Sequence, residues 1–196
     1  FEKQDFTDEQ NIAHRAQMQQ PSGSIILAQG GSGKTTVCQH TANVLRSVKG
    51  PEKVFCTSVQ KAVAIRNGGE SLHALFHLVN KDKNKPFYEM NTKSIQQIKN
   101  IINVMPEYKK KRLQLIEHLF IDEIQFLSAD GVKFISEFLK HFHSNNTIFG
   151  GIKVYMSGDI YQLESVCSKE EKNRYFFEAD ELNAFWHIKM IKNLRN

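Results

Sequence analysis

Residues 27–36, LAQGGSGKTT, constrain the fold of this chain more than any other segment. A short apolar run at residues 24–28 leads into them, and residues 35–48 follow with apolar side chains at helical spacing. Glycines at such a junction let backbone N–H groups curl around an anion at the N-terminus of a helix, whose dipole also favours negative charge. The sequence therefore predicts a buried strand, a phosphate-binding loop and a helix, in that order.

Residues 28–35 fit the P-loop pattern G-x-x-x-x-G-K-[ST], except that Ala28 takes the first position. A P-loop predicts a bound nucleotide, which we expect to be ATP with Mg²⁺. Lys34 is expected to reach the β- and γ-phosphates, and the Thr35 hydroxyl to bind Mg²⁺. The alternative is a glycine turn that binds nothing. The predicted nucleotide-binding residues of this loop are Gly30, Gly31, Ser32, Gly33, Lys34, Thr35 and Thr36.

Three further apolar runs, at residues 53–57, 118–122 and 152–157, predict strands. Between the last two, residues 129–142 place their apolar side chains on one helical face. Strands that alternate with helices form a parallel sheet with helices on both faces. We therefore predict the α/β class, with one P-loop NTPase domain of the RecA-like type over residues 1–196.

Residues 81–112 differ from the rest because they are polar, lysine-rich and punctuated by proline. They predict a surface excursion with a helix around residues 95–104. The basic run at residues 109–112 has two explanations, nucleic-acid binding or an ordinary solvated helix surface, and the second is favoured.

The chain of 196 residues is 40% hydrophobic, enough for a core, and its net charge of +5 permits a polyanionic partner without requiring one. No apolar run approaches the roughly 18–20 residues that span a bilayer, and no secretory signal opens the chain.

The three cysteines of the chain lack CxxC spacing, which argues against a zinc site and fits a reducing compartment. We expect an intracellular protein without a membrane partner, in the nucleus or a mitochondrion of a eukaryote or in a virus-infected cell. Because the chain begins with Phe1, we expect a piece of a longer protein.

An Asp-Glu pair, Asp122 and Glu123, ends the apolar run at residues 118–122. Hydrolysis of a nucleotide needs a carboxylate near the metal and a group that orients or deprotonates the attacking water. We expect Asp122 to hold Mg²⁺ and Glu123 to act on the water. The alternative is a solvated turn at the end of a strand.

A third polar cluster follows the run at residues 152–157, with Gly158, Asp159 and Gln162 in the pattern G-D-x-x-Q-L. A glutamine at this edge can sense whether a γ-phosphate is present, and the alternative is a polar turn. Ligands of open α/β sheets gather at the carboxyl ends of the strands. Lys34, Glu123 and Gln162 are therefore expected to meet around one triphosphate.

The P-loop, the Asp-Glu pair and G-D-x-x-Q-L, in this order, resemble motifs I, II and III of superfamily 1 helicases. Residues 57–78 (TSVQKAVAIRNGGESLHALFHL) resemble the DNA-contacting motifs of the PIF (petite integration frequency) helicases and their RecD-like relatives. Residues 6–10 (FTDEQ) resemble their adenine-contacting glutamine motif. Residues 175–186 resemble the segment after motif III, and residues 192–196 (KNLRN) resemble motif IV.

The resemblance implies the first RecA-like motor domain of an ATP-dependent DNA helicase, moving 5′ to 3′ on single-stranded DNA. It implies that Gln10 contacts adenine and that Arg195 reaches the γ-phosphate as an arginine finger. Gln10 has an alternative role in a capping box that begins at Thr7. Arg195 has the alternative of an ordinary surface arginine.

Three residues at or beyond the carboxyl end of the second predicted strand are candidates for nucleic-acid contact. The hydroxyls of Thr57 and Ser58 are placed to bind a DNA phosphate, and the alternative is a cap at the strand end. His73 either touches DNA or supports the loop that contains it. The aromatic residues of 175–186 favour core packing over base stacking.

The resemblance also implies the partners: single-stranded DNA or a single-strand/duplex junction, and a second RecA-like domain downstream. We expect this piece alone to bind nucleotide weakly, hydrolyse it slowly and not unwind DNA. Two alternatives stay open, an RNA-directed superfamily 1 helicase and a non-catalytic, nucleotide-switched nucleic-acid-binding module.

Overall fold

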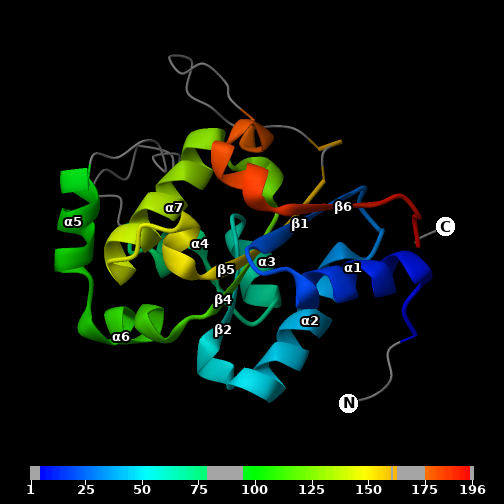
Figure 1. The fold of residues 1–196 in the computed structure, drawn as a ribbon, viewed down its shortest axis with the longest axis horizontal. Coiled ribbons are helices and arrows are strands. Elements are labelled where there is room, and N and C mark those ends of the chain that lie inside the picture. The colour runs from blue at the N-terminus through cyan, green and yellow to red at the C-terminus, as the bar shows by residue number, and fades with distance from the viewer. Residues whose placement is uncertain (1–4, 79–94, 160, 163–174, 195–196) are drawn as a thin grey trace.

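The computed structural model of the chain describes residues 5–78, 95–159, 161–162 and 175–194. At its centre is a six-stranded sheet in the order β3-β2-β4-β5-β1-β6 (Figure 1). All neighbouring strands pair in parallel. The strands are β1 (Gly23–Ala28), β2 (Val54–Ser58), β3 (Glu70–Ser71), β4 (His118–Asp122), β5 (Lys153–Gly158) and β6 (Trp186–Met190).

Helices cover both faces of the sheet (Figure 1). The first two pack on one face, and the opposite face is covered by α4 to α7. A short helix, α3, connects β2 to β3. The helices are α1 (Asp8–Gln19), α2 (Lys34–Lys49), α3 (Lys61–Arg66), α4 (Leu72–Leu75), α5 (Ile95–Val104), α6 (Glu107–Leu115) and α7 (Ala129–His143).

Two hydrophobic cores lie on either side of the sheet because successive side chains of a strand point to opposite faces. On β1, Ile25 belongs to the core beneath α7 and Ile26 to the core beneath α1 and α2. On the second side Phe120 and Tyr155 stack at 4.3 Å between ring centroids. The predicted α/β class, a parallel sheet with helices on both faces, is therefore confirmed.

The lysine-rich excursion is only partly a surface feature. The helix predicted around residues 95–104 is present as α5, and it is followed by α6, the helix that contains the basic run at residues 109–112. Ile98, Met105 and Leu113 of this segment are buried in the core beneath α7. Residues 81–94 of the excursion lie outside the described residues.

The aromatic segment after β5 divides between core and surface. Phe176 and Phe185 are buried, as predicted, whereas Phe177 and Trp186 are 47% and 54% exposed. Trp186 begins β6, an edge strand that pairs with β1 and was not predicted. Its outer side has no neighbouring strand in the described sheet, and its first two side chains are exposed.

Two of the cysteines, Cys38 and Cys56, are free thiols, and Cys167 lies outside the described residues. None of the helices in the described part of the chain combines the length and the apolar composition that a membrane span requires.

The Gly68-Gly69 pair yields a prediction about stability, because its two members are needed for different reasons. A Cβ on Gly69 would lie 2.1 Å from the carbonyl oxygen of Cys56 in β2, whereas a Cβ on Gly68 would meet nothing within 4 Å. Gly68 instead has a left-handed φ of +72°. Gly68→Ala should therefore cost about 1–2 kcal/mol from the backbone conformation alone, and Gly69→Ala clearly more. Urea unfolding of both variants measures the difference, and equal costs would contradict it.

Candidate nucleotide site

The phosphate loop connects β1 to α2 in the predicted order. Gly31 and Gly33 both have φ of +85°, a left-handed conformation that glycine adopts without strain. A Cβ on Gly33 would lie 2.3 Å from the side-chain nitrogen of Gln10. Gly33 also leaves the first turn of α2 without a side-chain cap, so its N–H groups are available to an anion.

Lys34 turns back over this loop. Its ammonium donates hydrogen bonds to the carbonyl oxygens of Ala28 at 2.6 Å and Gln29 at 2.9 Å. Burial lowers the pKa of Lys34, while the carboxylates of Asp159 and Asp122 oppose that shift. The ammonium therefore lies on the P-loop with negative charge close by.

Asp122 ends β4 and joins three parts of the site. One carboxylate oxygen accepts a hydrogen bond from the Thr35 hydroxyl at 3.0 Å. The other accepts from the Ser157 hydroxyl of β5 at 2.7 Å and from the backbone N–H of Glu123 at 3.0 Å. Thr35 and Asp122, which the sequence predicts as metal ligands, are thus adjacent.

Glu123 has a left-handed backbone with φ of 61°, which is uncommon for a residue other than glycine. Burial raises the pKa of its carboxyl, and the Asp122 charge raises it further. The buried Gln125 amide donates a hydrogen bond to the Glu123 carboxylate and accepts one from the backbone N–H of Asp159 at 3.1 Å. The conformation of Glu123 is therefore tied to the end of β5.

Asp159 connects this end of β5 to the P-loop. Its carboxylate accepts a hydrogen bond from the backbone N–H of Gly30 at 2.6 Å. Its carbonyl oxygen accepts from the backbone N–H of Gln162 at 3.3 Å. The Gln162 amide nitrogen lies 3.4 Å from where a Cβ on Gly30 would be. The predicted glutamine therefore lies beside the phosphate loop.

The capping-box explanation of Gln10 holds in the structure, and its contact with adenine stays a prediction. Its side-chain oxygen accepts from the backbone N–H of Thr7 at 3.0 Å, and its own N–H donates to the Thr7 hydroxyl at 3.3 Å, which completes a capping box. Its amide nitrogen faces Gly33 of the P-loop. The capping box therefore fixes Gln10 beside the phosphate loop.

These groups surround one cavity of about 570 Å³. It is lined by four of the predicted site residues, Gln10, Lys34, Glu123 and Gln162, whereas Ser32 is buried and does not line it. Arg195 lies outside the described residues; Leu194, which precedes it, donates a backbone hydrogen bond to Gly31 at 3.0 Å. The remaining lining residues are Asp5, Phe6, Gly30, Gly31, Gly33, Thr35, Thr36, Arg66, Asp122, Asp159 and Leu194.

The sequence alone did not identify four of the residues at the site: Phe6, Arg66, Gln125 and Ser157. Ser157 could have been found, because it occupies the end of a strand beside the Asp122 strand. Gln125 and Arg66 carry no such positional signal, since their place depends on how a short turn and a short helix fold back toward the cavity.

The hydroxyls predicted to contact nucleic acid are turned inward. Thr57 donates to the carbonyl oxygen of Glu70 at 2.6 Å, and Ser58 donates to that of Asp122 at 3.2 Å. Both residues are buried. This is the alternative in which they stabilise the strand end. His73 is half-buried in α4 and carries interactions of its own, so its contact with nucleic acid stays a prediction.

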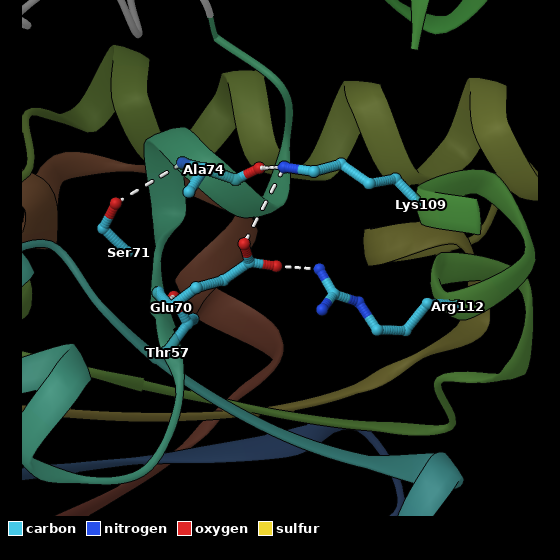
Figure 2. Close-up of polar contacts among 6 residues, drawn as sticks. All are labelled: Thr57, Glu70, Ser71, Ala74, Lys109 and Arg112. Carbon is cyan, nitrogen blue, oxygen red and sulfur yellow. Dashed lines mark hydrogen bonds and ion pairs between the residues drawn. The ribbon is translucent and has the colours of Figure 1, made fainter. Parts of the chain in front are cut away.

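Two residues of the basic run at residues 109–112 form polar contacts with other parts of the same chain. Figure 2 shows Lys109 and Arg112 extending from α6 toward Glu70 of β3. Arg112 forms a short ion pair with the Glu70 carboxylate, Lys109 lies 3.7 Å from it, and Lys109 also donates to the carbonyl oxygen of Ala74. The pairing with Glu70 is a third explanation for Lys109 and Arg112, which the two alternatives drawn from the sequence did not include. Sequence periodicity could not show that their partner lies on a distant strand.

A parallel sheet, a P-loop after β1 and an Asp-Glu pair after the nearby strand β4 define a P-loop nucleoside triphosphatase fold. The family model for PIF1-like helicase matches residues 6–196, and the chain belongs to the PIF1-like helicase family.

One relative, an ATP-dependent DNA helicase Pif1 from Psychrobacter sp. (strain PRwf-1), is 30% identical over 149 residues. The match covers 76% of this chain and 21% of that relative, so the chain spans about a fifth of its length. The crystal structure of Pif1 helicase from Candida albicans matches with a TM-score of 0.79 at 22% identity, over 97% of this chain and 40% of that one. The structure of Bacteroides sp. Pif1 in complex with ADP-AlF4 matches with a TM-score of 0.74 at 25% identity, over 99% and 44% of the two chains.

The ion pair of Glu70 and Arg112 can be tested by a double-mutant cycle. We expect Glu70→Ala and Arg112→Ala each to lower the free energy of unfolding, with a coupling of about 0.5–3 kcal/mol because the two residues are in direct contact. The coupling should shrink in 1 M salt, since both side chains are partly exposed. Urea unfolding at low and high salt measures it. The exposed Lys111→Ala is the control, and coupling of zero at low salt would show that the contact contributes nothing.

Proposed function

We propose that this chain binds ATP with Mg²⁺ and hydrolyses it as part of an ATP-dependent DNA helicase that moves along single-stranded DNA. The observation that carries the proposal is the convergence of Lys34, Asp122, Glu123 and Gln162 on one cavity, although they come from separate parts of the sequence. Family membership supports the reaction, because the Psychrobacter relative is an ATP-dependent DNA helicase.

The site's shape supports binding of the whole nucleotide. The base is proposed to lie against Phe6 and the Gln10 amide, at the end of the cavity formed by the entry to α1. The phosphates then run over the backbone N–H groups of the P-loop toward Glu123 and Gln162. The structure of Bacteroides sp. Pif1 in complex with ADP-AlF4 supports this proposal, because a protein with a similar fold binds a nucleotide.

The metal ligands fit Mg²⁺ because they are oxygen donors. The Thr35 hydroxyl and one Asp122 oxygen are 3.0 Å apart, and Ser157 holds the other Asp122 oxygen, which fixes the direction of the carboxylate. Mg²⁺ prefers carboxylate and hydroxyl oxygens together with phosphate oxygens. Bound there, the ion would neutralise charge on the β- and γ-phosphates.

Glu123 is the proposed base or water-orienting group, and Gln162 the proposed sensor of the γ-phosphate. The raised pKa of Glu123 brings its proton affinity closer to that needed to accept a proton near neutral pH. Asp159 and Gln125 link Glu123 to the phosphate loop through hydrogen bonds. A change at the phosphates therefore has a direct path to the base.

The nucleic-acid partner and the second motor domain are proposed from the family. His73 remains the candidate for direct DNA contact, while Thr57 and Ser58 are proposed to shape the sheet edge beside it. Arg195 is proposed to act on the γ-phosphate together with a second RecA-like domain.

Glu123→Gln tests the proposed chemistry. It should leave Mg-ATP affinity within about threefold, because the amide keeps the size of the side chain. It should lower the ATP hydrolysis rate by about 10²–10⁴-fold, the usual contribution of a general base. Nucleotide binding is measured by fluorescence titration, and hydrolysis with and without single-stranded DNA or RNA.

Two further variants frame this result. Lys34→Ala should weaken Mg-ATP binding itself, since its ammonium lies on the loop that holds the phosphates. The exposed Glu107→Gln, on α6 and away from the cavity, should change neither quantity. An unchanged hydrolysis rate in Glu123→Gln would support a nucleotide-switched binding module instead, and stimulation by RNA alone would support the RNA-directed alternative.

A further inference from the structure

The cavity is poor in positive charge for a site that would hold a triphosphate. Among its described lining residues, only Lys34 and Arg66 are cationic, whereas Asp5, Asp122, Glu123 and Asp159 are acidic. Lys34 already donates to two backbone carbonyls of the loop. A triphosphate entering this cavity would therefore meet carboxylates on several sides, and each available cation matters.

Arg66 approaches the cavity from the side opposite to Lys34. Lys34 follows β1, and Arg66 ends α3, which follows β2. Because the sheet order is β2-β4-β5-β1, the Asp122–Glu123 pair at the end of β4 lies between the two cations. The end of the cavity nearest Glu123 is where the γ-phosphate is proposed to lie, and Arg66 is on that side.

The guanidinium of Arg66 is free to bind a ligand. The residue is exposed, and within the described part of the chain it makes no hydrogen bond or ion pair. Arg66 is also close enough to Glu123 to oppose the rise of that carboxyl's pKa. Arginine suits such a place because its planar fork matches phosphate oxygens two at a time.

The backbone that carries Arg66 is fixed relative to the phosphate loop. Its neighbour Asn67 accepts a hydrogen bond at 2.9 Å from the side chain of Gln39 on α2, the helix that begins at Lys34. Asn67 also closes the end of α3 through a 3.0 Å backbone bond to Val63. Arg66 therefore extends from a backbone segment that is fixed relative to the phosphate loop.

We propose that Arg66 is a second phosphate-binding cation, which binds the γ-phosphate and lets the site distinguish ATP from ADP. The inference rests on the proposed nucleotide function. Its consequence is that the terminal phosphate would be bound from both flanks, by Lys34 on the β1 side and Arg66 on the β2 side. Since Arg66 leads directly into β3 and α4, the same contact connects the nucleotide to the segment that carries His73.

Nucleotide titrations on the whole chain test this. Arg66→Ala should weaken binding of a non-hydrolysable ATP analogue with Mg²⁺ by about tenfold or more, the loss expected for a charge-assisted hydrogen bond. ADP affinity should stay within about twofold. Arg66→Lys, which keeps the charge without the planar fork, should fall between Arg66→Ala and the parent chain.

Arg15→Ala is the matched control, because Arg15 is an exposed arginine on α1 that does not line the cavity. It should leave both affinities unchanged, and thermal unfolding should be the same for all variants. Equal loss of ATP and ADP affinity in Arg66→Ala, or no loss, would overturn the inference while leaving the proposed function standing. Failure of the parent chain to bind either nucleotide would instead overturn the proposed function.

Discussion

The carboxylate of Asp122 is the interaction on which the arrangement of the site depends. Its oxygens accept hydrogen bonds from the first turn of α2, from β5 and from the backbone of Glu123. These elements are adjacent because β5 is paired between β4 and β1, the strand that leads into α2. Replacing the carboxylate would leave the buried Ser157 hydroxyl without its acceptor. An unsatisfied buried donor lowers the stability of the folded state, here at the site itself.

A second set of hydrogen bonds connects the P-loop, the Asp122–Glu123 pair and the segment at Asp159 into one network. Gln125 joins Glu123 to Asp159, and Asp159 joins the end of β5 to Gly30 of the phosphate loop. The left-handed backbone of Glu123 costs free energy by itself and persists because these neighbours hold it. Gly158 permits the close approach of the Gln125 side chain to the end of β5, since a Cβ on Gly158 would lie 2.9 Å from the Gln125 side-chain oxygen.

Much of this was predictable from local pattern. The strands that form the site end in conspicuous polar residues, so parallel pairing alone brings Lys34, Asp122 and Gln162 to one edge. What the sequence did not show depends on tertiary contact. Strand β3 is two residues long, too short to show a period, and β6 alternates apolar and polar residues over only five positions. The inward direction of the Thr57 hydroxyl follows from the position of the Glu70 carbonyl, which no local pattern reports.

The lysine-rich segment shows why a count of charges is a poor guide to a binding surface. Residues 109–112 carry four positive charges in sequence, yet Lys109 and Arg112 face Glu70, and Lys110 lies 3.8 Å from Glu107. Opposite charges at such distances cancel much of the field that would attract a polyanion. By contrast, the residues on either side of Arg66 in the sequence, Ile65 and Asn67, are uncharged, and Arg66 lines the cavity of the site. Where a cation can act on a phosphate depends on the carboxylates the fold places beside it, and in this chain a single arginine is better placed than the cluster.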